Sequence, residues 1–219
     1  MPSSSLKENW TVTWNSPGKR YQMIIGTVII GAIIFSLQFF FAYIQKRKGA
    51  VLNDWVLSRI PAHNVSVLIF ALIWGMALLI LIRAINNPSI YIMYCWTLIF
   101  VYLVRFVTLS VVALDPPPGM VDLVDPLSSA FYANLPITKD LFFSGHTSTM
   151  VLIFLCLERR TDKIIALIAA LAVACLLLVQ HIHYTIDILA APIVVYACYR
   201  LTRYLFFKQE GTAIMFSEK

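Results

Sequence analysis

Two residues near the end of this 219-residue chain form the pattern with the clearest chemical potential. His183 and Asp187 are four residues apart, so on a helix their side chains would share one face. A carboxylate bonded to one imidazole nitrogen fixes the tautomer and raises the basicity of the other nitrogen. The spacing therefore predicts a nucleophilic histidine with its orienting acid.

A second histidine lies in a different setting, within Ser144-Gly145-His146-Thr147. Serine and glycine favour the start of a helix, and the amides and dipole of a helix N-terminus attract an anion such as phosphate. A histidine at that point can donate a proton to a leaving oxygen. If His146 and His183 serve the same phosphate, their rings are expected to lie within about 8 Å of each other.

The roles of His181 and Arg105 are less determined. His181 is two residues from His183 and points to a different helix face, so it is either an interfacial, supporting histidine or part of the site. Arg105 lies in an apolar run, about 13 Å below its outer end, where a charge is costly and usually functional. It either binds phosphate oxygens or forms an ion pair with the following loop. The acidic candidates in that loop are Asp115, Asp122 and Asp125.

The composition identifies the environment as a membrane. Hydrophobic residues make up 60% of the chain, charged residues 13%, and the mean hydropathy is +0.80. A single soluble core cannot bury that much apolar surface, which excludes a water-soluble enzyme, a disordered protein and a nucleic-acid module. The net charge of +6 is attributed to basic residues that set the orientation in the membrane and contact lipid headgroups. The four cysteines lie in apolar runs without C-x-x-C spacing and are interpreted as small hydrophobic residues: Cys95, Cys156, Cys175 and Cys198.

Six apolar runs predict an all-α, polytopic fold with six transmembrane helices. The runs are Tyr21–Ile44, Val65–Ile82, Ile90–Leu114, Phe142–Leu157, Ile164–Val179 and Ile188–Phe207. We expect an N-terminal cytoplasmic or interfacial segment over 1–20, a catalytic membrane domain over 21–207 and a polar, frayed tail over 208–219. Trp10 and Trp14 would share a helix face, so the first segment is either an interfacial helix or a disordered tail. No cleaved signal peptide is expected.

Basic residues predict the orientation. With both termini in the cytoplasm, eleven basic residues fall inside and five outside. The inner set is Lys7, Lys19, Arg20, Arg83, Arg159, Arg160, Lys163, Arg200, Arg203, Lys208 and Lys219, and the outer set is Lys46, Arg47, Lys48, Arg59 and Lys139. The histidines then lie on the outer or lumenal side, although the run Lys46-Arg47-Lys48 opposes this arrangement. The membrane is the cell membrane in a bacterium, or the Golgi, endoplasmic reticulum or plasma membrane in a eukaryote.

The motifs resemble those of a known family. Residues 140–147, DLFFSGHT, resemble the G-D-x-x-F-S-G-H-T block of sphingomyelin synthases, and residues 180–187, QHIHYTID, resemble their H-x-H-Y-T-x-D block. Arg105 with Thr108, ahead of three prolines, is similar to the R-x-x-T…P region of that group. Both blocks belong to the wider type 2 phosphatidic acid phosphatase superfamily, whose six-helix layout is matched over roughly 60–205. The short chain favours a minimal relative, of the kind expected in bacteria.

The resemblance implies a two-step reaction without metal or other cofactor. His183 attacks the lipid phosphorus, Asp187 orients it, and His146 protonates the departing diacylglycerol oxygen. The donor is a membrane phospholipid with a phosphocholine or phosphoethanolamine headgroup, and the acceptor is ceramide or diacylglycerol. The remaining site residues of the resemblance, assigned to substrate binding, are Arg105, Asp140, Ser144, Gly145, His181 and Tyr184.

Other functions compete with this interpretation. The same histidines serve a lipid phosphate phosphatase or a phospholipase C-like hydrolase, in which water is the acceptor. The chain lacks the K-x6-R-P motif of classical lipid phosphatases and has Leu177 where they have arginine, which disfavours that branch. A transporter is disfavoured because no repeated broken helices are evident and charge gathers at one end. A zinc site of His146, His183 and Asp187 has suitable ligand types, but phosphoryl transfer through histidine does not need it.

Overall fold

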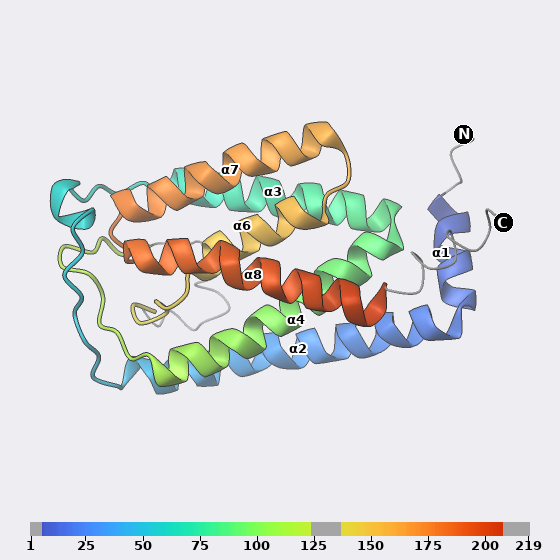
Figure 1. Ribbon diagram of the computed structural model, residues 1–219, viewed down its shortest axis with the longest axis horizontal. Helices are drawn as coiled ribbons and strands as arrows, with labels where there is room; N and C mark the ends of the chain where they lie inside the picture. The colour runs from blue at the N-terminus through green and yellow to red at the C-terminus, as the bar shows by residue number, and fades with distance from the viewer. Residues whose placement is uncertain (1–5, 124–136, 208–219) are drawn as a thin grey trace.

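The structure, a computed structural model that describes residues 6–123 and 137–207, is built of helices (Figure 1). They are α1 (Leu6–Asn15), α2 (Pro17–Gln45), the 3-10 helix η1 (Leu57–Arg59), α3 (Ser66–Asn86), α4 (Pro88–Val111), α6 (Gly145–Cys156), α7 (Arg160–Val179) and α8 (Thr185–Phe206). The described residues contain no strand, only an isolated bridge between Ala50 and Leu114. The predicted all-α class is confirmed.

Local sequence explains where several helices begin. Proline stands at the first turn of α2 and α4, where its missing N–H loses no intrahelical bond. Asn87 caps α4 by accepting a hydrogen bond from the Ser89 amide at 3.0 Å. Ser144 caps α6 in the same way, accepting from the Thr147 amide at 3.3 Å. These side chains satisfy amides that have no partner within the helix.

Within the described residues, five helices are long and apolar enough to cross a membrane: α2, α3, α4, α7 and α8. The fourth predicted span, Phe142–Leu157, is shorter than expected. Residues 142–144 are not helical, so α6 has only 12 residues. Twelve residues rise about 18 Å, less than the roughly 30 Å hydrocarbon core. The expected count of six spanning helices is therefore not confirmed.

The short helix α6 occupies the centre of the bundle and packs against α3, α4, α7 and α8 (Figure 1). Its side chains Met150, Leu152 and Ile153 are completely buried. Helix α7 presents the buried small residues Ala166 and Ala170 to the same core, which allows close helix approach. A short helix enclosed by longer ones can hold polar groups at its N-terminus away from the lipid.

Helix α2 lies along α4 on the outside of this core. Their contact contains two small apolar clusters, one of Leu37, Phe41, Ile44 and Leu109 and one of Ile33, Cys95 and Ile99. The outward faces of the long helices carry many exposed apolar side chains, as expected for surfaces in contact with lipid tails.

The two ends of the bundle are formed by different segments of the chain (Figure 1). At one end, α1 packs beside the α3–α4 turn, where the Trp10 indole donates to the carbonyl of Ile85 at 2.6 Å and its ring lies 6.4 Å from Tyr91. Of the two alternatives for the N-terminal segment, the described residues thus form a packed helix. The predicted division at residues 20 and 207 stays a prediction, and 208–219 lie outside the described residues. The opposite end, here called the histidine end, is formed by the non-helical segments 46–56, 60–65, 112–123, 137–144 and 180–184.

Candidate active site

The two histidines that were predicted to share a substrate lie side by side at the histidine end. The ring centroids of His146 and His183 are 6.3 Å apart, with the planes inclined at 64°. His146 is the second residue of α6, and His183 lies in the short connection between α7 and α8. The α6–α7 hairpin returns the chain to its starting level, and so brings together residues that are far apart in sequence. The separation lies within the distance of about 8 Å that was expected for two histidines serving one phosphate.

Asp187 is the nearest ionisable partner of His183. Its Oδ2 lies 3.5 Å from Nδ1 of His183, and the two side chains are 1% and 0% exposed. This is an ion-pair distance, longer than the ordinary N–H···O range of about 2.7–3.2 Å. The contact does not arise from a shared helix face, as the four-residue spacing suggested, because α8 begins only at Thr185. Instead, Asp187 Oδ2 accepts a hydrogen bond from the Tyr184 amide at 3.0 Å and turns back toward His183.

The start of α6 is tied directly to the start of α8. The Ser144 amide donates to the backbone carbonyl of Asp187 at 3.1 Å. The Ser144 carbonyl in turn accepts from the Ser148 hydroxyl at 2.6 Å, while its own hydroxyl caps the helix. Ser144 is fully buried, and the ring centroid of Phe70 lies 6.4 Å from that of His146. The described contacts of Ser144 are thus with backbone and neighbouring side chains that fix the position of His146.

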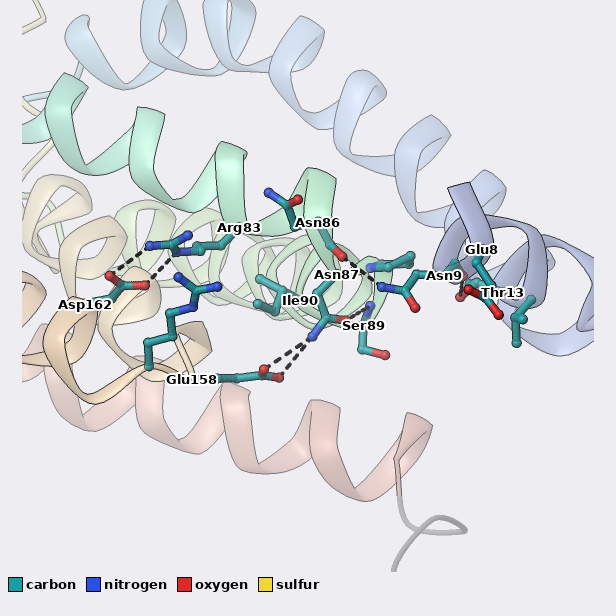
Figure 2. Close-up of a pocket in the computed structure, with 13 residues that line it drawn as sticks. Glu8, Asn9, Thr13, Arg83, Asn86, Asn87, Ser89, Ile90, Glu158 and Asp162 are labelled. Atoms are coloured by element: carbon teal, nitrogen blue, oxygen red, sulfur yellow. Dashed lines mark hydrogen bonds and ion pairs between the residues drawn. The ribbon is translucent and has the colours of Figure 1, made fainter. Parts of the chain in front are cut away.

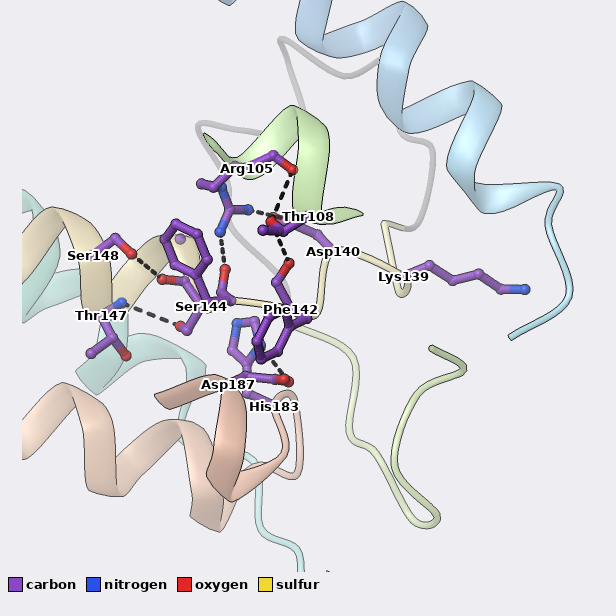
Figure 3. A network of polar contacts seen from close by, with 12 residues as sticks. Arg105, Thr108, Lys139, Asp140, Phe142, Ser144, Thr147, Ser148, His183 and Asp187 are labelled. Atoms are coloured by element: carbon purple, nitrogen blue, oxygen red, sulfur yellow. Dashed lines mark hydrogen bonds and ion pairs between the residues drawn. The ribbon is translucent and has the colours of Figure 1, made fainter. Parts of the chain in front are cut away.

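Arg105 holds the segment that precedes α6 (Figure 3). It is 3% exposed, and its guanidinium donates to the backbone carbonyl of Phe143 and to the carboxylate of Asp140. One turn further along α4, Thr108 donates to the carbonyl of Phe142 at 3.1 Å. Two residues on one face of α4 therefore fasten the residues that lead to His146.

The alternative to phosphate binding was an ion pair of Arg105 with Asp115, Asp122 or Asp125, and Arg105 does form an ion pair, but those partners are wrong. Asp115 pairs with Lys139 at 2.7 Å, and Asp140 takes the arginine. Asp125 lies outside the described residues. Arg105 therefore contacts one member of the predicted substrate-binding set, Asp140, and packs against another: a Cβ added to Gly145 would lie 3.0 Å from its Nη2.

Two predicted substrate-binding residues make their described polar contacts with loops rather than with the histidine pair. Both ring nitrogens of His181 face backbone carbonyls, Nδ1 that of Pro118 at 3.2 Å and Nε2 that of Ile60 at 2.9 Å. The hydroxyl of Tyr184 donates to the carbonyl of Asp115 at 2.9 Å and accepts from the Leu52 amide at 3.2 Å. His181 and Tyr184 therefore bridge the α7–α8 connection to the segments 50–65 and 112–123.

Sequence reasoning did not single out Asp54, which is bound to the start of α8. Its Oδ2 accepts from the Thr185 amide at 2.6 Å, and its Oδ1 accepts from the Thr185 hydroxyl at 3.0 Å. Burial raises the pKa of Asp54, but hydrogen bonds from Thr185 and from the amides of Leu57 and Val56 outweigh it and hold the pKa below its usual value. In the sequence, Asp54 is only an aspartate before a short turn. Its contact with Thr185 joins residues 131 positions apart, so no local pattern could have indicated it.

A cavity of about 550 Å³ lies at the other end of the bundle, between α1, the α3–α4 turn and the start of α7 (Figure 2). Arg83 forms a two-point ion pair there with Asp162, at 2.6 and 3.1 Å. Asn87 donates to both carboxylate oxygens of Glu158 at 3.3 Å. These groups are paired across the helix ends, and the cavity contains none of the predicted site residues. In the described part of the chain, no group of three or more His, Cys, Asp or Glu side chains is arranged to hold a metal ion.

Comparison with known families places this geometry in context. Residues 139–204 match the family model described as PAP2 superfamily C-terminal. The match supports membership of the PAP2 superfamily. The matched region contains His146, His183 and Asp187, whereas Arg105 precedes it. No curated protein matches the chain. With the five apolar helices, the match supports a multi-pass membrane enzyme of the lipid phosphatase and phosphotransferase type.

Proposed function

We propose that the protein is a lipid phosphotransferase that moves a phospho-headgroup from a glycerophospholipid to a lipid alcohol, through a phosphohistidine at His183. The observation that carries the proposal is the 6.3 Å separation of the His146 and His183 rings, with Asp187 on Nδ1 of His183. One histidine oriented by a carboxylate and a second histidine facing it supply a nucleophile and an acid on opposite sides of a phosphorus atom.

In the first step, Nε2 of His183 attacks the phosphorus of the donor and a P–N bond forms. The P–O bond to diacylglycerol breaks, and His146 gives its proton to the departing oxygen. Asp187 stabilises the charge that His183 acquires, because its carboxylate faces Nδ1. In the second step, His146 takes the proton of the acceptor hydroxyl, a new P–O bond forms and the P–N bond breaks. The acceptor is ceramide or diacylglycerol.

Hydrolysis is the second candidate, since water in place of the lipid alcohol would give a phosphatase or a phospholipase C-like enzyme. The burial of His183 and Asp187, at 1% and 0% exposure, favours transfer to a lipid. A site closed to solvent limits the attack of water on a phosphohistidine.

The charge distribution supports a membrane orientation for this reaction. Eleven basic residues of the sequence belong to the α1 side of the predicted topology and five to the histidine side, so we place the histidine end outside or in a lumen. The opposing run Lys46-Arg47-Lys48 is in part structural. Arg47 donates to the carbonyl of Leu109 at 3.0 Å, and its own carbonyl accepts from Lys139.

The test uses purified protein in liposomes that contain a headgroup-labelled phospholipid, with and without ceramide or diacylglycerol. Label in a new lipid supports transfer, and label in water supports the hydrolase. The phosphoenzyme is trapped in parallel. We expect His183→Ala to abolish trapping, and Asp187→Asn to reduce it on the order of a thousandfold or more, by analogy with other acid–histidine pairs. His63→Ala is the matched control, because His63 is exposed in the α2–α3 connection. Full activity of His183→Ala would overturn the proposal.

A further inference from the structure

The connection between α2 and α3 is hydrogen-bonded at several points to the segment that carries His183. The Leu52 amide donates to the Tyr184 hydroxyl at 3.2 Å, and the Ile60 carbonyl lies 2.9 Å from Nε2 of His181. Further along, the His63 amide donates to the carbonyl of Val179 at 3.0 Å. The Val65 amide donates to Oε1 of Gln180 at 3.2 Å. We call residues 50–65 the brace, because they contact residues 179, 180, 181, 184 and 185 of the segment that carries His183.

Asp54 makes the most concentrated contact of the brace. Each oxygen of its carboxylate accepts from Thr185, Oδ2 from the amide and Oδ1 from the hydroxyl. Oδ1 also accepts from the amides of Val56 at 2.9 Å and Leu57 at 3.2 Å, and these bonds fix the carboxylate within its own turn of the brace. A hydrogen bond to a charged group is about twice as strong as one between neutral groups.

Thr185 is the first residue of α8, and its amide has no partner within the helix. The residue before it, Tyr184, provides no side-chain cap for this amide. Asp54, 131 residues earlier in the sequence, therefore acts as the capping residue of α8. Thr185 also lies midway between His183 and Asp187, so whatever holds Thr185 holds both ends of that pair.

We propose that Asp54 is a positioning residue for the His183–Asp187 pair, which it fixes by capping the first turn of α8 from the brace. The inference rests on the proposed function. The 3.5 Å between His183 Nδ1 and Asp187 Oδ2 is already longer than a hydrogen bond, so loosening of this turn weakens the contact further. Asp54 acts by keeping the carboxylate of Asp187 on the imidazole.

The activity test compares Asp54→Asn with Asp122→Asn in the same liposomes. Asp122 lies in another loop at the histidine end, and its carboxylate makes no hydrogen bond within the described residues. An asparagine at position 54 presents its amide N–H groups to Thr185 or to Val56 and Leu57, which are themselves donors. We expect kcat per folded molecule to fall about tenfold, the rate equivalent of one lost hydrogen bond to a charged group, with KM changed less than about twofold. Asp122→Asn should match the wild type.

A double variant separates positioning from general stability. If Asp54 acts through Asp187, then Asp54→Asn combined with Asp187→Asn should lose no more activity than Asp187→Asn alone. Multiplied losses in the double variant would overturn the proposal. So would a loss of thermal stability in Asp54→Asn with kcat per folded molecule unchanged.

Hydrogen exchange gives a readout that does not need the reaction. Asp54→Asn should accelerate amide exchange over 183–188 and leave the middle of α7 unchanged. If the wild type neither transfers nor hydrolyses, the proposed function fails, and exchange alone then decides whether Asp54 holds this turn. Unchanged exchange in Asp54→Asn overturns the inference whether or not the enzyme is active.

Discussion

The guanidinium of Arg105 is paired with the carboxylate of Asp140, across the gap between α4 and the segment that leads into α6 (Figure 3). The arginine side chain is 4% exposed and the aspartate 23%, so the pair is largely withdrawn from solvent. A second donor of the same guanidinium binds the carbonyl of Phe143. Arg105 thus positions the residues before His146. A role in binding phosphate would use the N–H groups of the guanidinium that these two contacts leave over.

The first prediction follows from this pairing. Arg105→Leu leaves the charge of Asp140 and the carbonyl of Phe143 without their donor, and loss of one partner of a buried pair costs about 3–5 kcal/mol. Partial exposure of Asp140 places the expected loss at the lower end of that range. Arg105→Lys keeps the charge but not the two-point geometry, and should be intermediate in thermal unfolding and in turnover.

Arg83→Leu provides the matched control, because it removes a comparable two-point ion pair, with Asp162, at the end remote from the histidines. It should lower thermal stability and retain turnover per folded molecule. We expect Arg105→Leu to lose both. If the two variants behave alike, Arg105 is a structural residue only, and its role in phosphate binding should be dropped.

The second prediction concerns the close approach of Gly145 to Arg105. A Cβ at position 145 would lie 3.0 Å from Nη2 and 3.2 Å from Nη1 of the guanidinium. Gly145→Ala therefore displaces Arg105 or the first turn of α6, and with it His146. We expect turnover per folded molecule to fall at least about tenfold, equivalent to a change of about 1.4 kcal/mol in the barrier.

Gly75→Ala is the control for this variant, since an added Cβ there meets nothing within 4 Å and alanine favours a helix interior. It should leave turnover unchanged and stability equal or higher. Equal turnover in Gly145→Ala and the wild type would show that the approach of the guanidinium to α6 is not needed for activity.

The meeting of the two histidines could be predicted from the sequence, because it depends only on the order of the helices. An apolar run that begins beside His146, a charged turn and a second run that ends at His183 form a hairpin, and a hairpin returns the chain to its starting level. The cap at Ser144 could also be predicted from the sequence, since serine before glycine favours the start of a helix. Hydropathy did not show that Phe142 and Phe143 lie outside the helix, because apolar residues in a packed loop have the same composition as those in a span.

The contacts that refine the site could not be predicted, because they join distant segments through one or two atoms. The four-residue spacing correctly pointed to Asp187 as the partner of His183, but for a helical reason that does not apply before Thr185. Periodicity carries no information on Asp54 and Thr185, which are 131 residues apart. Arg105 had several acidic candidates in the sequence, and only the fold of 137–144 selects Asp140.

The third prediction concerns His181, which has φ of 56° and whose two ring nitrogens lie within hydrogen-bond distance of carbonyls in two loops. His181→Ala should lower the free energy of unfolding by about 1–3 kcal/mol, because the ring contact with the carbonyls of Ile60 and Pro118 is lost and alanine disfavours the left-handed region. Turnover per folded molecule should stay within a few-fold of the wild type. His181→Gly removes the backbone strain but not the lost bonds, so it should recover only part of the stability. A stable but inactive His181→Ala would instead place this ring in the substrate site.

The last prediction concerns acid. The hydrogen bond from Lys139 holds the pKa of Asp115 below its usual value of 3.8. Burial raises the pKa of Asp54, but its hydrogen bonds from Thr185 and the neighbouring amides outweigh burial and hold the pKa below its usual value. A carboxyl whose pKa is lower in the folded than in the unfolded state stabilises the fold above the unfolded pKa, and this contribution is lost as pH falls through the folded pKa. Thermal stability should therefore decline below about pH 4.

Asp54→Asn and Asp115→Asn should each be less stable than the wild type at neutral pH and approach it in acid, where the wild-type carboxyl is also protonated. Unfolding curves measured from pH 7 downward in one detergent provide the comparison, and a constant difference at every pH would contradict the role assigned to these carboxylates.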